Sequence, residues 1–143
     1  MEKRANILAL ATKISLESMT YTGITYNDPE YRILAPIVTD DMCSVAMHMR
    51  LETPRTAAEL ARRCNADVNF VQKQIDKLVE IGFARSRTTD GVLGYYYPIW
   101  VPGIMEGILS NNEQCEKYPD LGYSFEEYTR RRIELVAPTL SSG

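Results

Sequence analysis

The stretch over residues 56–100 constrains the fold most, because it has the pattern of two short helices followed by a β-hairpin. Thr56 and Glu59 have the spacing of a capping box, in which a hydroxyl and a carboxylate each satisfy a free N–H at a helix start. Asp67 follows a polar turn and is placed to cap a second helix. Thr88 to Gly91 is a turn signal between two strand-like runs. Helix, turn, helix and hairpin is the order of a winged helix-turn-helix.

Two more helices are expected before this stretch. Ile7, Leu10 and Ile14 recur at helical spacing, which predicts an amphipathic helix from about Lys3 to Met19. Thr39 is placed as the N-cap of a further helix. That helix would be the first of the helix-turn-helix core.

After the hairpin the pattern predicts two further helices. Residues 104–109 suit a short helix, and residues 111–122 form a polar stretch. Ser124 and Glu127 repeat the capping-box spacing, so a helix is expected to begin there. Pro138 is expected to end it, because proline lacks the N–H that a continuing helix needs.

These patterns together predict a mainly α fold with a small β-hairpin. A winged helix-turn-helix core would occupy residues 37–103. Residues 1–36 would form an N-terminal helical extension, and residues 104–143 a C-terminal helical extension with the start of a linker. The length of 143 residues suits a single domain with a substantial core.

Composition and charge narrow the class of protein. The formal net charge is −3, so no overall electrostatic attraction draws the chain to nucleic acid or to an anionic membrane. Cys43, Cys64 and Cys115 are far apart and form no CxxC pair, so the sequence encodes neither a zinc site nor an iron–sulfur site. No segment approaches the ~20 apolar residues that a membrane span needs. We therefore expect a cytoplasmic protein without a membrane partner.

A winged helix can read DNA by placing its second core helix in the major groove. The outward positions of that helix include Asp76 and Glu80, which cancel the charge of its two lysines and would face phosphate unfavourably. On the DNA-binding interpretation, the contacting residues are Gln72, Lys73 and Lys77 of this helix with Arg85 and Arg87 of the hairpin. The same residue types are also ordinary on a solvated surface.

Catalysis by this chain is not expected. His48 is the only histidine, and no carboxylate close in sequence is placed to partner it as a general base. Asp40 and Asp41 are explained as acidic residues in the first turn of a helix. The sequence has no glycine-rich phosphate loop, nucleophile elbow or cofactor motif. We therefore predict no catalytic, cofactor-binding or metal-binding residues.

Five segments together resemble a known family. They are Ile37 to Met49, Thr56 to Ala61, Val79 to Ala84, Tyr97 to Glu106 and Phe125 to Thr129. In them the chain resembles the N-terminal winged-helix region of large anaerobe oxidoreductases of the 4Fe-4S ferredoxin and pyridine nucleotide-disulfide type. The resemblance implies that cysteine-rich cluster motifs, sometimes with a flavin and nucleotide domain, follow in a longer protein. Because this chain reaches its last residue before any cluster motif, 4Fe-4S clusters and flavin are expected in such a parent protein and not here.

Two hypotheses about function follow. The first is a non-catalytic module that docks or regulates an iron–sulfur oxidoreductase, with the redox domain of the same or a partner protein as its partner. Trp100, Ile104 and Tyr128 are its expected docking residues, against that domain or against a second copy in a homodimer. The second hypothesis is a winged-helix transcription regulator that binds DNA and dimerises through its terminal helices.

Overall fold

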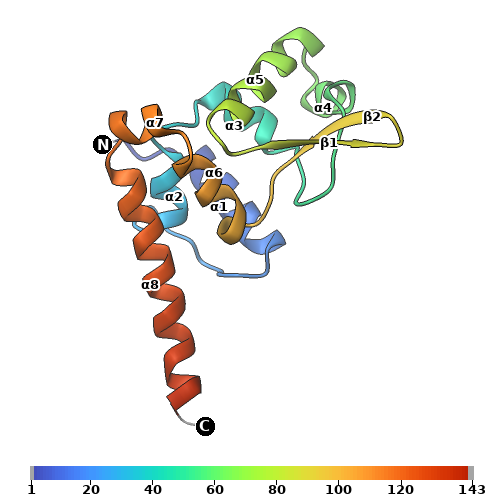
Figure 1. The fold of residues 1–143 in the computed structure, drawn as a ribbon. Helices are drawn as coiled ribbons and strands as arrows, with labels where there is room; N and C mark the ends of the chain where they lie inside the picture. Colours follow the sequence, from blue (N-terminus) through green and yellow to red (C-terminus); the bar gives the residue numbers. More distant parts are fainter. Residues whose placement is uncertain (1, 142–143) are drawn as a thin grey trace.

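The structure, a computed structural model, describes the backbone of residues 2–141 and the side chains of residues 2–133. Within these residues the chain is mainly helical with one antiparallel hairpin (Figure 1), which confirms the expected mainly α fold with a small hairpin. The elements are, in chain order, α1 (Ala5–Glu17), α2 (Pro29–Leu34), α3 (Asp40–Ala46), α4 (Ala57–Cys64), α5 (Val68–Glu80), β1 (Arg85–Thr89), β2 (Val92–Tyr96), η1 (Trp100–Ile104), α6 (Met105–Leu109), α7 (Asn112–Lys117) and α8 (Asp120–Ser141).

One hydrophobic core includes residues from all three segments that the sequence suggested. Helix α1 lies against α2 and α3 and buries Ile7, Leu10 and Ile14 completely. The indole Nε1 of Trp100 donates a hydrogen bond of 3.0 Å to the hydroxyl of Ser15, and both side chains are buried. This bond fastens the segment after the hairpin to α1, so the N-terminal helix is part of the body of the molecule.

A polar network at the end of α1 makes a second connection to the hairpin side. Lys13 Nζ donates to the hydroxyl of Tyr97 at 2.5 Å and to the carbonyl oxygen of Met49 at 2.7 Å. The carboxylate of Glu17 accepts from the Tyr97 hydroxyl at 2.8 Å and from the backbone N–H of Leu51 at 2.9 Å. Burial alone would raise the pKa of Glu17, but these bonds and the Lys13 ammonium outweigh it and hold that pKa below its ordinary value.

The cap expected at the start of α5 is present, and so is the Thr56 half of the capping box expected at the start of α4. The Thr56 hydroxyl accepts from the backbone N–H of Glu59 at 3.1 Å, and the Asp67 carboxylate accepts from those of Asn69 and Phe70 at 2.9 and 3.2 Å. Asn65 takes a left-handed conformation, with φ of +52°, at the end of α4. Side-chain caps of this kind satisfy the free N–H groups at a helix start. The turn between the two helices is therefore specified locally.

The hairpin has the expected turn and one strand that the sequence did not indicate. Strands β1 and β2 pair in register from Arg85 opposite Tyr96 to Thr89 opposite Val92. Asp90 and Gly91 both have positive φ, as the common two-residue hairpin turn requires. On the far edge of β2, the backbone groups of Arg55 and Tyr95 exchange hydrogen bonds of 3.0 and 2.8 Å. A one-residue strand thus joins the hairpin just before α4.

The C-terminal part differs from expectation in two places. Helix α8 begins at Asp120, not at Ser124, because Ser124 is buried and its hydroxyl donates to the carbonyl oxygen of Asp120 at 3.3 Å, a bond made inside a helix. Pro138 does not end the helix, which continues to Ser141, and residues 142–143 of the expected linker lie outside the described residues. The polar stretch contains α7, capped by Asn111.

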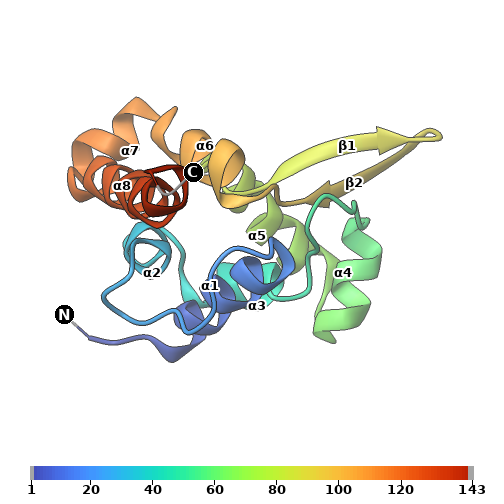
Figure 2. The ribbon, with the colours of Figure 1, turned by 90° about the horizontal axis from the view of Figure 1, so that it is seen from below.

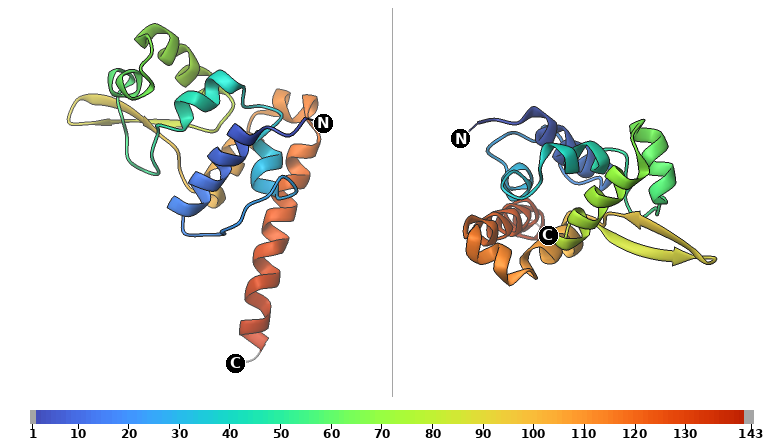
Figure 3. Two further views of the ribbon diagram at one scale, coloured as in Figure 1. Left: turned by 180° about the vertical axis from the view of Figure 1, so that it is seen from behind. Right: turned by 90° about the horizontal axis from the view of Figure 1, so that it is seen from above.

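The hairpin and the C-terminal helices lie on different sides of the molecule. Figures 2 and 3 show the hairpin projecting from one side of the body, with α7 and α8 on the other side. Figure 1 shows α8 extending past the remaining elements. Among residues 2–141, no helix has both the length and the apolar character that crossing a membrane requires.

Candidate macromolecular interface

Helix α5 carries three of the expected DNA-contacting residues. It packs on α3 and α4 through Val71, Ile75 and Leu78, which are fully buried. Lys73 and Lys77 lie on its exposed face, and neither forms an ion pair with any residue whose side chain the structure describes. These two ammonium groups are therefore accessible to an anionic partner.

Gln72 of α5 is less accessible than the two lysines. Its side-chain amide is half-buried, and its Nε2 donates to Asp76 Oδ1 at 2.8 Å and to the Tyr95 hydroxyl at 3.4 Å. The amide thus faces the hairpin and has partners inside the chain. To read a base edge, it would first have to leave these partners.

Arg85 and Arg87 turn to the other face of the hairpin. Side chains alternate along a strand, so both arginines share a face with Tyr96 and not with Tyr95. Arg87 pairs with Glu52 at 3.1 Å and lies 4.4 Å from the centre of the Tyr96 ring. Its bond to Glu52 raises the pKa of the guanidinium. Arg85 donates to the carbonyl oxygen of Gly103 at 3.4 Å. The two arginines therefore lie on the face of the hairpin opposite to the one that Gln72 contacts, while Lys73 and Lys77 lie on the exposed face of α5.

Helix α5 and the hairpin have exposed apolar side chains, at elements where a DNA-binding winged helix would have cationic ones. The sequence analysis did not predict this feature. Val92 and Leu93 at the hairpin tip are 54% and 49% exposed. On α5, Val68, Phe70 and Val79 are also exposed. The spacing of Val68 in the sequence matches the apolar stripe of α5. Val68 is nevertheless exposed, because it is in the first turn of the helix, outside the core. We call these five residues, which are exposed at separate points of α5 and of the hairpin, the α5–hairpin surface.

The part of the sequence that holds most of this surface has a basic excess. Between Arg50 and Asp90 the sequence has eight Lys or Arg and six Asp or Glu residues, although the whole chain is negative. The pKa of Arg55 is lowered, first by burial and then by repulsion from Arg63 and Arg50. Arg55 relieves part of this cost by donating to the carbonyl oxygen of His48 at 2.6 Å. The connection between α3 and α4 is therefore locally cationic.

The expected docking residues are not on the surface, so this part of the prediction is wrong. Trp100, Ile104 and Tyr128 each have no exposed side-chain area. Trp100 is bound to α1 through Ser15, and the Tyr128 ring meets that of Tyr21 edge-on at 5.9 Å. Their apolar surface is used to attach η1 and α8 to the body of this same chain.

A buried ion pair holds α8 in place. Arg131 binds Glu30 at 2.5 Å and Asp28 at 3.1 Å, and its guanidinium lies 3.9 Å from the centre of the Tyr21 ring. The Glu30 side chain is fully buried, and burial raises its pKa even though Arg131 opposes the shift. This cluster therefore joins α8 to α2 and to the segment between α1 and α2.

The carboxylates and cysteines that the sequence analysis considered for catalysis or metal binding lie apart from one another in the fold. Asp40 binds Arg4 at 2.6 Å, and bonds to Arg4 and Asn6 lower its pKa. The Sγ atoms of the three cysteines each donate to a different carbonyl oxygen, those of Asn6, Ser44 and Leu109. Among the described residues, no three His, Cys, Asp or Glu side chains gather as a metal site would require. The donor set of this chain therefore does not fit an iron–sulfur cluster.

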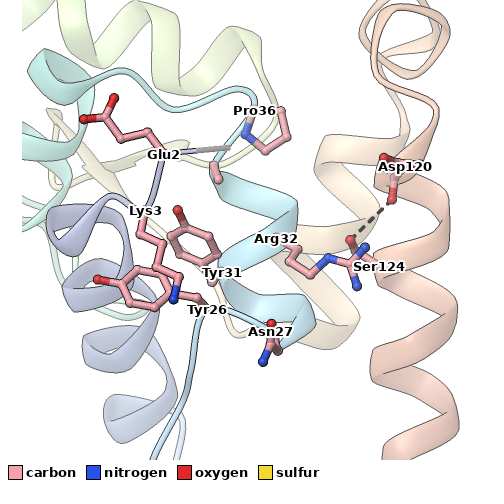
Figure 4. A pocket seen from close by; sticks show the side chains of 10 residues that line it. Glu2, Lys3, Tyr26, Asn27, Tyr31, Arg32, Pro36, Asp120 and Ser124 are labelled. Atoms are coloured by element: carbon pink, nitrogen blue, oxygen red, sulfur yellow. Dashed lines mark hydrogen bonds between the residues drawn. The ribbon is translucent and has the colours of Figure 1, made fainter.

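A pocket of about 290 Å³ lies between the N-terminal segment, α2 and the start of α8. Figure 4 shows Tyr26 and Tyr31 on one wall and Asp120 with Ser124 on the other. The Tyr31 hydroxyl accepts from the backbone N–H of Arg4 at 3.1 Å, and the Ser124 hydroxyl is bonded inside α8. These hydroxyls are bound within the chain, and neither is paired with a base as a nucleophile would be.

In comparisons with known proteins, no protein-family model, no curated protein and no solved structure matches the chain.

Proposed function

We propose that this chain is a non-catalytic winged-helix module that docks on the redox domain of an iron–sulfur oxidoreductase. The winged-helix assignment is supported by the order α3, short strand at Arg55, α4, α5, β1, β2. It is also supported by the pairing of Arg55 with Tyr95, which gives the hairpin a third strand before the second helix. The redox partner is proposed from the family that the sequence resembles.

The exposed apolar tip of the hairpin is the observation that carries the docking proposal. A wing that touches DNA meets phosphate and sugar, so cations and small polar residues serve it best. Val92 and Leu93 at this tip are instead suited to burial against protein. Gln72, Arg85 and Arg87 are already bound within the chain. Docking therefore uses the α5–hairpin surface.

In this proposal the clusters and any flavin belong to the partner domain. The cysteines of this chain do not fit cluster ligation, so no redox step is assigned to its residues. Its role is to bind and orient the redox domain.

The test measures binding to a redox domain. A cluster-loaded domain from an oxidoreductase of the resembled family is titrated with this chain under anaerobic conditions in a calorimeter. The double variant Val92→Asp, Leu93→Asp should weaken binding about 10-fold or more, because each apolar side chain buried at an interface contributes roughly 1.5–3 kcal/mol. Leu16→Asp is the control, since Leu16 is 57% exposed but lies on α1 and not on the hairpin. An absence of binding, or equal binding by all variants, would refute the proposal.

The second candidate function is DNA binding, and the accessible Lys73 and Lys77 favour it. Fluorescence anisotropy with random and genomic duplexes, at about 50 and about 150 mM salt, separates the two functions. The docking proposal expects only weak binding that the higher salt removes. Tight, sequence-selective binding at the higher salt, lost in Lys73→Ala, Lys77→Ala, would instead establish the DNA-binding function and overturn the docking proposal.

A further inference from the structure

Helix α8 presents a stripe of four exposed residues on the face that points away from the body. These are Tyr123, Glu126, Arg130 and Ile133, of which Tyr123 is 49% and Ile133 62% exposed. We call them the outward stripe. The residues that α8 buries, Leu121, Ser124 and Tyr128, lie on the opposite side of the helix, because successive residues rotate by 100°. The outward stripe is therefore a second face, independent of the one that attaches α8 to the body.

The spacing of the outward stripe is that of a helix–helix seam. Its members are separated by three, four and three residues, as are the a and d positions of a coiled coil. The stripe is apolar at both ends and charged in the middle, with Glu126 before Arg130. Neither of these two charges forms an ion pair with any residue in the described range 2–133. These two charges thus lack an ion-pair partner among the described side chains, while the Tyr123 ring has the guanidinium carbon of Arg32 at 5.7 Å from its centre.

We propose that the outward stripe binds the same stripe of a second copy of this chain, with the two α8 helices antiparallel. In a parallel pair, Glu126 would face Glu126 of the other copy and Arg130 would face Arg130, so both layers would repel. In an antiparallel pair, Glu126 faces Arg130 of the other copy twice by symmetry, and Tyr123 packs on Ile133 at both ends. A two-fold axis passes at the level of residue 128, and the interface is self-complementary.

The surroundings of the outward stripe suit this pairing. Glu127 at its edge is held by Arg32 of the same chain at 3.3 Å, so it brings no free negative charge to the seam. A Cβ atom placed on Gly122 would meet nothing within 4 Å, so the approach to the first turns of α8 is open. Figures 1 and 3 show α8 at the edge of the molecule, where a second helix can lie alongside it. The seam from residue 123 to residue 133 is about 15 Å long, which predicts a weak dimer.

Sedimentation velocity from about 10 to about 500 µM tests the pairing. The wild type should dimerise over this range. Glu126→Arg and Arg130→Glu should each weaken the dimer at least ~10-fold, because each converts two attractive contacts into two repulsive ones. The double variant Glu126→Arg, Arg130→Glu should regain dimerisation, since it restores opposite charges in every antiparallel layer.

A mixture of the two single variants excludes an effect within one helix. Glu126 and Arg130 are four residues apart, so each single change also alters the charge pattern of its own α8. When mixed, the two single variants should form a heterodimer although neither dimerises alone. Arg62→Glu, an exposed change on α4, is the control and should leave the dimer unchanged. A wild type that stays monomeric throughout, or a double variant that fails to recover, would overturn the proposal, which does not depend on the docking partner.

Discussion

Replacement of Gly107 by alanine should destabilise the fold, because α6 touches the turn after α5 at this residue. A Cβ atom on Gly107 would lie 2.3 Å from the carbonyl oxygen of Gly82 and 3.2 Å from its carbonyl carbon. Gly82 has a φ of +89°, a conformation that glycine adopts without strain and other residues resist. The atoms that the new Cβ would meet belong to the backbone of Gly82, so no side chain can rotate away to make room.

The size of the effect follows from the overlap. Non-bonded carbon and oxygen atoms rarely approach closer than about 3 Å, so α6 would have to move by roughly 0.7 Å. The fully buried Met105 and Ile108 on α6 would move with it. Overpacking of this kind costs about 1–3 kcal/mol, while alanine gains up to ~1 kcal/mol over glycine as a helix former. When the full gain is subtracted, the net loss is centred on roughly 1 kcal/mol, or about 2–4 °C in Tm for a chain of this size.

Gly122→Ala is the matched control for this prediction. It makes the same chemical change in another helix, but the new Cβ would meet nothing within 4 Å. Gly122→Ala should therefore stabilise the protein by about 0.4–1 kcal/mol. Urea unfolding followed by circular dichroism, at a concentration below dimerisation, measures both variants. If Gly107→Ala proved as stable as the wild type, the close approach of α6 to the Gly82 turn would be refuted.

Two further predictions concern charged side chains that are paired within the fold. The lowered pKa of Glu17 means that its ionised form stabilises the fold above the unfolded value of about 4.3, and that this contribution is lost as the pH falls through the lower folded value. Glu17→Gln should cost about 1–2 kcal/mol at pH 7 and flatten the loss of stability below about pH 5, as measured by urea unfolding at several pH values; a parallel pH dependence in wild type and variant would contradict this. Arg131→Met should cost about 3 kcal/mol, because it leaves the buried Glu30 unpaired, and should cost clearly less in a Glu30→Gln background. Additive costs in that double-mutant cycle would show that the two side chains are not coupled.

The parts of the fold that were predicted from sequence are those fixed by neighbouring residues. The caps at Thr56 and Asp67 and the turn at Asp90 depend on groups within three residues of one another, so a local pattern suffices. The strand at Arg55 depends on Tyr95, forty positions away, and one paired residue leaves no periodicity to detect. At Ser124 the local pattern misled, because a hydroxyl that caps a helix and one buried inside it can share the same sequence spacing.

The candidate site shows the same division. Lys73 and Lys77 were correctly predicted to be exposed, since helical periodicity alone places them opposite Val71, Ile75 and Leu78. Helical periodicity could not predict the burial of Trp100, Ile104 and Tyr128. These residues are apolar enough to suit an interface, and only the packing of α1 and α8 around them decides that they form core.

The two proposed surfaces lie on different parts of the molecule, and the buried contacts between them fix their relative position. Trp100 joins the segment after the hairpin to α1 through Ser15, and Arg131 joins α8 to Glu30 of α2 and to Asp28 just before it. The hairpin and α8 are thus attached to different elements, on different sides of the body (Figure 2). A dimer through the outward stripe would therefore leave both hairpin tips free, and each copy could dock a redox domain of its own. It follows that dimerisation should leave the affinity of each copy for a redox domain unchanged, whereas Val92→Asp, Leu93→Asp should weaken docking and spare the dimer.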